Sequence, residues 1–189
     1  MSETLFDLHL RNAEIEAGVA HVLAAPKDEG RLDLIVRRPA IDAREVIQEG
    51  ELDLEVGLVG DNWLTRGSSR TDNGLGHPEM QLNVMNIRFA ELIAGSLDRV
   101  PLAGDQLFVD LDLSGENLPP GTRLRIGEAV IEVTAFPHTG CKKFVERFGL
   151  DAMKFANSEF GRRHNLRGIN AKVIEPGKVR TDDPVKKLT

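Results

Sequence analysis

Cysteine is almost absent from this chain: Cys141 is the only one among 189 residues. One cysteine cannot form a disulfide within the chain, so nothing in the sequence indicates an oxidising compartment. The cysteine sets that hold iron–sulfur clusters are missing for the same reason. The fold must therefore depend on a hydrophobic core, and 41% hydrophobic residues in a chain of this length can supply one.

Long apolar runs and an excess of positive charge are also missing. No stretch approaches the ~20 apolar residues needed to cross a bilayer, and the start MSETLFDLHL is not a secretory signal. The net charge of -6 gives no general attraction to nucleic acid or to an anionic membrane. We therefore expect a cytoplasmic protein with neither nucleic acid nor a membrane as its partner.

Motifs for two common kinds of cofactor are missing as well. No Gly-x-Gly-x-x-Gly follows a predicted strand, so there is no sign of a dinucleotide site. His138 and Cys141 form an H-x-x-C pair, but a structural zinc site needs four ligands, and the other histidines are scattered along the chain. We expect neither zinc nor a dinucleotide.

What the sequence does contain is a series of short strand patterns separated by glycine and proline turns. Leu32, Leu34 and Val36 alternate in one of them, which is typical of a half-buried strand. The segment 122–136 has the pattern of a hairpin, with Gly127 starting a type II′ turn. We predict strands at 19–26, 31–39, 107–114 and 168–175, helices at 42–50, 86–95, 141–149 and 151–161, and core contacts for Phe144, Phe148, Phe155 and Phe160. Many short strands with few helices favour a mostly β, barrel-like fold.

Cys141 follows the predicted hairpin, in the segment FPHTGCKKF and at the expected start of a helix. Free N–H groups at a helix start, together with Lys142 and Lys143, stabilise a thiolate, which attacks electrophiles, carries persulfide sulfur or binds a soft metal. A lone cysteine is commonly inert core packing, although a core position seldom adjoins two lysines, so both interpretations stay open. His138 could polarise the thiol or a bound ligand; the alternative is a turn residue that faces solvent.

Three segments resemble the MOSC domain, the C-terminal domain family of molybdenum cofactor sulfurases. They are VGLVGDNW, then GDQLFVDLDLSGENLPPGTRLRIGEAVIEVTAFPHTGCKKF, then RGINAKVIEPGKV. They follow the order of the family and span about residues 57–179, and the hairpin-to-cysteine block is the most specific part. The resemblance implies one MOSC-like β-barrel domain over residues 1–189, with a few short peripheral helices.

The resemblance also implies that Cys141 binds the molybdenum of a pterin cofactor or carries sulfur. Some relatives reduce N-hydroxylated compounds with that cofactor, and others are sulfurase domains or stand-alone proteins. Two departures from the family pattern are present: Gly140 stands where many relatives have proline, and Asp182-Asp183 replaces a late Gly-Asp. Both put the pocket or a ligand position in question.

A pterin cofactor brings a phosphate, so cations and N–H donors are expected around the cysteine. The candidates are Lys142, Lys143, Arg167, Asn170, Arg66, Ser68, Ser69 and Arg70. For any single one of them, a solvated surface position is the commoner role. Asp61 is expected to fix its own turn through an Asx-type hydrogen bond.

We therefore expect a small-molecule substrate and oxidoreductase or sulfur-transfer chemistry, with Cys141 and His138 as catalytic residues. Because the chain has no electron-carrier motif of its own, the electrons or the sulfur would come from a donor protein. The alternative is a non-catalytic carrier or docking module with the same barrel and an idle Cys141. The departures at Gly140 and Asp182 motivate this alternative.

Overall fold

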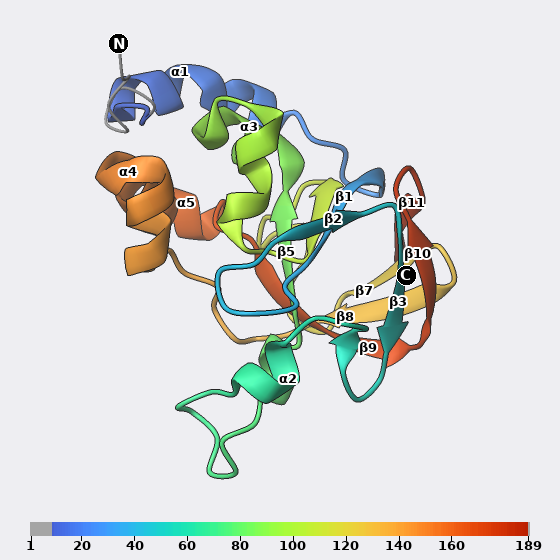
Figure 1. Cartoon of the computed structure of the whole chain (residues 1–189). Coiled ribbons are helices and arrows are strands. Elements are labelled where there is room, and N and C mark those ends of the chain that lie inside the picture. Colours follow the sequence, from blue (N-terminus) through green and yellow to red (C-terminus); the bar gives the residue numbers. More distant parts are fainter. Residues whose placement is uncertain (1–8, 189) are drawn as a thin grey trace.

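A computed structural model of the chain describes residues 9–188 and shows a β-barrel with the longer helices gathered against one side and the short helix Trp63–Arg66 apart from them (Figure 1). The strands are β1 (Glu29–Arg37), β2 (Glu45–Ile47), β3 (Glu49–Asp53), β4 (Gly57–Leu58), β5 (Leu82–Asn86), β6 (Leu107–Asp110), β7 (Arg123–Ile126), β8 (Ala129–Val133), β9 (Ile169–Glu175), β10 (Gly177–Arg180) and β11 (Pro184–Leu188). The helices are α1 (Asn12–Leu23), α2 (Trp63–Arg66), α3 (Ile87–Ala94), α4 (Lys142–Asn157) and α5 (Glu159–Arg163), with 3-10 helices η2 (Pro78–Met80) and η3 (Leu97–Ala103). Within residues 9–188, none of the helices combines the length and the apolar character that crossing a membrane requires.

The barrel closes because a strand near the C-terminus pairs with the first strand of the chain. Around the ring the order is β11-β7-β8-β9-β5-β6-β1, and β11 pairs with β1, so seven strands form a closed barrel. The pair β5–β6 is parallel, and the other contacts of the ring are antiparallel. β2 extends the sheet from β1, while β10, β3 and β4 form a smaller sheet. The prediction of a mostly β barrel with a few short helices is confirmed.

Alternating apolar side chains fill the barrel. Leu107, Val109 and Leu111 are fully buried in this interior cluster, as the alternation in the sequence predicts. The predicted hairpin consists of β7 and β8, and Gly127 at its turn has a φ of +53°. A type II′ turn requires a positive φ at this position, and glycine adopts it without steric cost.

The alternation predicted for β1 is only partly correct. The register of β1 against β6 shifts between Leu32 and Leu34, so the strand changes faces at that point. Leu32 and Ile35 therefore lie in the barrel interior, whereas Leu34 and Val36 pack against the cluster beneath the helices.

This second cluster lies between the helices and the outer face of the barrel (Figure 1). Phe89 of α3 and Phe108 of β6 are fully buried in it. The predicted core contacts of Phe144, Phe148 and Phe155 are confirmed, because all three side chains are buried in the same cluster. Phe160, the fourth predicted contact, is 38% exposed and lies at the margin of the helical layer.

Segment 19–26 is not the predicted strand, because residues up to Leu23 belong to α1. Ile15, Val19 and Val22 recur at helical spacing and pack into the cluster beneath the helices. The apolar period is therefore that of a helix and not that of a strand.

Segment 42–50 is not the predicted helix, because it forms β2 and the start of β3. Asp42, the predicted N-cap, has a φ of +60°, whereas an N-cap residue has an extended backbone. Ile47 of β2 pairs with Ile35 of β1, and this pairing outweighs the local helix propensity.

The remaining helix predictions agree with the structure. The Asn86 side chain accepts the Phe89 N–H at 3.1 Å and caps α3, and Gly95 ends the helix in the left-handed conformation. The helix predicted at 141–149 is the first part of α4. The helix predicted at 151–161 covers the second part of α4 and the start of α5. Within α4, Gly149 breaks the helical geometry with a φ of +89°.

Closure of the barrel brings backbones so close at Gly30 that a side chain cannot fit. A Cβ there would overlap the carbonyl oxygen of Asp110 in β6, while Gly30 also pairs with Val185 of β11. We expect Gly30→Ala to lower the free energy of unfolding by about 1–3 kcal/mol, because the strands must separate to admit the methyl group. Urea denaturation would measure this loss. Gly115→Ala is the control, since its Cβ would have no neighbour nearer than 3.9 Å, and equal losses in the two variants would contradict the prediction.

Candidate functional site

Residues 134–141, the cysteine loop, lead from β8 to Cys141, which caps the N-terminus of α4. Cys141 has extended backbone angles, φ -122° and ψ -178°, and its carbonyl oxygen accepts the N–H groups of Phe144 and Val145 at 3.0 and 3.1 Å. The side chain is a free thiol at the protein surface. The interpretation of Cys141 as inert core packing is therefore wrong, and its sulfur can meet a ligand from solvent.

Asn157, the last residue of α4, holds the residue that precedes the cysteine. Its Oδ1 accepts the Gly140 N–H at 2.9 Å, and its Nδ2 donates to the Gly140 carbonyl at 3.1 Å. A proline at this position would lose the first of these bonds, because proline has no N–H. A Cβ would also lie 3.0 Å from Cγ of Met153. The departure at Gly140 thus belongs to a hydrogen-bond arrangement that keeps the cysteine loop in place.

The second departure, at Asp182-Asp183, lies in the turn between β10 and β11, on the side of the barrel away from α4 (Figure 1). Asp182 has a φ of +70°, a conformation that glycine adopts more easily. Its N–H donates to the Leu32 carbonyl at 2.8 Å, and the Leu32 N–H donates to the Asp183 carbonyl at 2.9 Å. The two aspartates therefore take part in barrel closure.

His138 is turned away from solvent and toward a buried ion pair, so its interpretation as a solvent-facing turn residue is wrong. Arg167 Nη1 donates to Asp105 Oδ2 at 2.7 Å, and His138 Nδ1 lies 3.4 Å from Asp105 Oδ1. The Asp105 side chain is fully buried, and that of His138 is 11% exposed. Burial, together with the charges of Arg167 and Arg38, holds the pKa of His138 well below its ordinary value, so the ring is neutral at pH 7. Burial raises the pKa of Asp105, and Arg167 opposes that rise.

Arg167 and Asn170, two of the predicted cofactor ligands, are engaged inside the protein. Arg167 Nη2 donates to the Ala103 carbonyl at 3.1 Å, and its guanidinium carbon lies 4.9 Å from the centre of the Phe144 ring. Asn170 is fully buried, and its Nδ2 donates to the Phe136 carbonyl at 3.0 Å. Asn170 therefore holds the cysteine loop directly, and Arg167 holds the acid that faces His138 of that loop.

A second buried ion pair lies under the connection between β1 and β2. Asp61 accepts Arg38 Nε at 2.8 Å on one carboxylate oxygen and Arg38 Nη2 at 2.8 Å on the other. The side chains of Arg38 and Asp61 are 4% and 0% exposed. Asp61 also accepts the Trp63 N–H at 2.9 Å, which confirms the predicted Asx-type bond. The aspartate thus fixes its own turn and the start of the loop that leads to β2.

Cations gather against the first turns of α4. Asp42 Oδ1 accepts Lys143 Nζ at 2.9 Å and Arg147 Nη2 at 3.1 Å. Arg44 lies beside them, since a Cβ on Gly104 would meet Arg44 Nη2 at 3.2 Å and Arg147 Nη1 at 3.6 Å. The Nε atom of Arg44 is buried and has no hydrogen-bond partner in the described chain. We name the basic cluster as Arg44, Lys143 and Arg147 together with Arg66 of α2, whose charge acts on Arg44.

The positive charge of the basic cluster is not fully compensated. Burial lowers the pKa of Arg44, and the charges of Arg147 and Arg38 lower it further. Desolvation of the guanidinium and the charge of Arg38 also lower the pKa of Arg66, although much of that side chain is exposed. Arg31, which is hydrogen-bonded to an aspartate, shows the opposite shift, a raised pKa. A bound anion would relieve the repulsion within the cluster.

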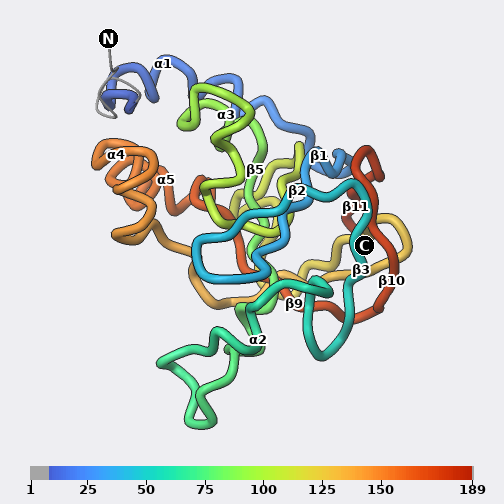
Figure 2. The backbone as a smooth tube through the Cα atoms, viewed as in Figure 1, coloured from blue at the N-terminus to red at the C-terminus, as the bar shows by residue number. Residues whose placement is uncertain are grey.

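The long loop after α2 projects from the barrel (Figure 2). Arg70 in this loop lies over the Phe136 ring of the cysteine loop, with its guanidinium carbon 5.0 Å from the ring centre. Ser68 accepts the Arg70 N–H at 3.1 Å, and Ser69 is exposed. Lys142 is exposed directly after the cysteine. The predicted ligands thus divide into surface cations and two buried supports, Arg167 and Asn170.

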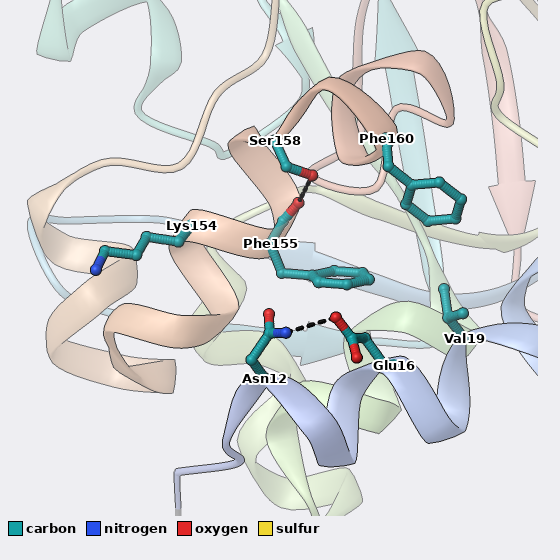
Figure 3. Close-up of a pocket in the computed structure, with 7 residues that line it drawn as sticks. All are labelled: Asn12, Glu16, Val19, Lys154, Phe155, Ser158 and Phe160. Carbon is teal, nitrogen blue, oxygen red and sulfur yellow. Dashed lines mark hydrogen bonds between the residues drawn. The ribbon is translucent and has the colours of Figure 1, made fainter.

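Two small cavities adjoin His138. One, of about 230 Å³, is also lined by Thr134 and Asn170, and the other, of about 250 Å³, by Arg162 and Arg167. A separate cavity of about 440 Å³ lies between α1 and the α4–α5 pair. Figure 3 shows its apolar wall, formed by the Phe155 and Phe160 rings, and none of the predicted site residues lines it.

Comparison with protein families matches residues 71–186, more than half of the chain, to the MOSC domain. The chain belongs to the MOSC domain family. The match includes the cysteine loop, β9 and all but the last residues of β11, so the suspected family is confirmed.

Solved structures show the same fold. The YuaD protein from Bacillus subtilis superimposes with a TM-score of 0.62 at 17% identity, over 84% of this chain and 95% of YuaD. YiiM from Escherichia coli superimposes with a TM-score of 0.53 at 24% identity, over 84% of this chain and 70% of YiiM. A structure described as a hypothetical protein superimposes with a TM-score of 0.57 at 25% identity, over 86% of this chain and 69% of that protein. A search of curated protein sequences finds no match.

Sequence alone did not single out Arg44, Arg147 or Asp105 of this MOSC domain. No spacing links Arg44 to Arg147, because the loop before β2 and helix α4 meet only in the folded protein. One signal was present for Asp105, which is a charged residue just before the apolar run of β6 and lies within a MOSC-like segment.

The ion pair of Arg38 and Asp61 should be essential for stability. We expect Asp61→Asn to lower the free energy of unfolding by about 3–5 kcal/mol, because it leaves a buried guanidinium without its counter-ion. Glu45→Gln is the matched control, since Glu45 pairs with Arg37 at the surface. This substitution should lower the free energy of unfolding by less than about 1 kcal/mol. Chemical denaturation of both variants measures the difference, and similar losses would contradict this account.

His138 should make the stability depend on pH. Its pKa is lowered in the folded state, so its contribution is present above the ordinary pKa of about 6.5 and is lost as the pH falls below it. We expect the protein to lose about 1 kcal/mol more than a His138→Gln variant between pH 6.5 and 5.5. The measurement is the urea midpoint of both proteins against pH. Parallel losses in the two proteins would show that His138 titrates in the same way folded and unfolded.

Proposed function

We propose that this MOSC protein binds a molybdenum pterin cofactor, with Cys141 as the protein ligand of the metal and the basic cluster as the holder of the cofactor phosphate. One observation carries the proposal: an exposed thiol stands at the N-cap position of α4, near cations whose charge is not fully compensated. Thiolates are soft ligands that suit such a metal, and guanidinium groups suit a phosphate.

The residues present fit such a group. The buried Nε of Arg44 is a donor that lacks an acceptor, and a phosphate oxygen would supply one. Gly104 has a φ of +85° and no side chain, so the space beside the guanidinium groups of Arg44 and Arg147 stays open. Because the chain has one cysteine, it offers one thiolate, and the other ligands of the metal would belong to the cofactor.

When bound, a molybdenum pterin cofactor supplies oxidation and reduction at its metal. The chain's own residues would then bind and orient the cofactor and the substrate. Lys142 and Lys143 would keep positive charge beside the sulfur. Asp105, which faces His138, and Asn170, which donates to the Phe136 carbonyl, would hold the cysteine loop in place. The substrate would be a small molecule that reaches the exposed sulfur side of α4, and electrons would come from a donor protein.

Metal analysis of protein purified from a host that makes the cofactor tests this proposal. We expect molybdenum in the wild type, almost none in Cys141→Ser, and a reduced content in Arg44→Gln, because the last variant loses a phosphate donor. Arg123→Gln is the control, since Arg123 is an exposed residue of β7 outside the basic cluster. No molybdenum in the wild type, or equal contents in wild type and Cys141→Ser, would rule the proposal out.

The exposed thiol also favours a second candidate function, sulfur carriage without a metal. In that reaction the Cys141 thiolate attacks the outer sulfur of a persulfide donor, forms Cys–S–SH and releases the thiolate of the donor. Mass spectrometry after treatment with a persulfide donor should then find one added sulfur on the peptide that holds Cys141. If neither molybdenum nor sulfur is bound, the remaining interpretation is a docking module with an idle cysteine.

A further inference from the structure

The cavity of about 250 Å³ between the cysteine loop and α5 is lined by cations and by no carboxylate. His138 and Thr139 of the loop form one wall, Arg162 of α5 lies on another, and Arg167 adjoins both. No residue of the basic cluster lines this cavity, and neither does Cys141. It is therefore a separate site from the one proposed for the molybdenum cofactor.

The two arginines that line this cavity differ in whether an acid compensates their charge. The two Nη atoms of Arg167 are used by Asp105 and by the Ala103 carbonyl, and its Nε is buried with no hydrogen-bond partner. Arg162 is exposed, and no carboxylate of residues 9–188 forms an ion pair with it. Asp105, which lies beside His138, is already engaged by Arg167.

The state of His138 is consistent with a positive potential in the cavity. Burial and then the charges of Arg167 and Arg38 keep its ring neutral, and Asp105, 3.4 Å from Nδ1, is the acid that faces it. Burial, the larger cause, opposes any uncompensated charge in the cavity, whereas the guanidinium charges that disfavour the imidazolium favour an anion.

We propose that this cavity binds a small tetrahedral oxyanion, either free phosphate or sulfate or the phosphate group of a small ester. Arg162 supplies the charge and a fork of N–H donors, and the Thr139 hydroxyl supplies a further donor. The volume suffices for the ion and a few further atoms. An occupant would connect α5 to Thr139, close to Gly140 and Cys141, and so would hold the cysteine loop against the helical layer.

Phosphate titration of the full chain, followed by NMR at the Thr139 amide, tests this site separately from the basic cluster. We expect the Thr139 signal to move in a saturable way in the wild type and in Arg44→Gln, which changes only the other site. In Arg162→Gln the apparent affinity should fall at least about tenfold, because one charge-assisted contact is lost. Arg163→Gln is the matched control, since the neighbouring arginine is equally exposed but does not line the cavity.

A second titration with glycerol phosphate distinguishes the two sources of the oxyanion. Tighter binding of the ester than of inorganic phosphate assigns the site to small phosphate esters, and the reverse assigns it to the free ion. A Thr139 signal that does not respond to either compound, or equal responses in Arg162→Gln and Arg163→Gln, overturns the proposal. Thermal unfolding of both variants confirms that they are folded, which is expected of substitutions at exposed positions.

Discussion

The carboxylate of Asp105 is the contact on which the arrangement around the cysteine depends. It is fully buried, accepts Arg167 at 2.7 Å and lies 3.4 Å from the His138 ring. Asp105 lies just before β6, Arg167 lies just before β9, and His138 belongs to the cysteine loop. One acid thus joins three separate parts of the chain. A buried ion pair of this kind contributes little net stability compared with apolar packing, yet removing one partner is costly. The ion pair instead fixes the positions of these three parts of the chain relative to one another.

The surface part of the site contrasts with this buried framework. Cys141 is exposed, and Asp42 is the one carboxylate in ion pairs with the basic cluster among the described residues. Burial, and after it the charges of neighbouring arginines, lowers the pKa of Arg44 and of Arg66. A buried framework thus presents an exposed thiol beside cations that have few acidic partners, and the proposed anion site depends on this arrangement.

Much of the fold could be predicted from the sequence, because local patterns and the final structure agree in most strands. The alternation of Leu107, Val109 and Leu111 and the glycine at the hairpin turn each specify one arrangement. The prediction of a strand at 19–26 is wrong because Val19 and Val22 continue a helical period that begins with Ile15 in α1. β2 was missed because it is exposed, short and held by its pairing with β1.

For the site, the sequence could indicate residue types but not their partners. Cys141 and the lysines after it are neighbours in the chain, so their association was predictable. Arg44, Arg147 and Asp105 are distant in sequence from one another, and only the packing of the β1–β2 loop against α4 brings the two arginines together. His138 was predicted as a catalytic residue or as a turn residue that faces solvent. Its burial beside Asp105 was not predictable, because no local pattern connects the two residues.

The most direct test of the central claim is X-ray absorption at the molybdenum edge of the loaded protein, compared with Cys141→Ser loaded in the same way. If the Cys141 sulfur binds the metal, the wild-type spectrum requires one more sulfur neighbour than the spectrum of the variant. If the two spectra have the same sulfur shell, the thiol is not a ligand of the metal, and the account of this site is wrong.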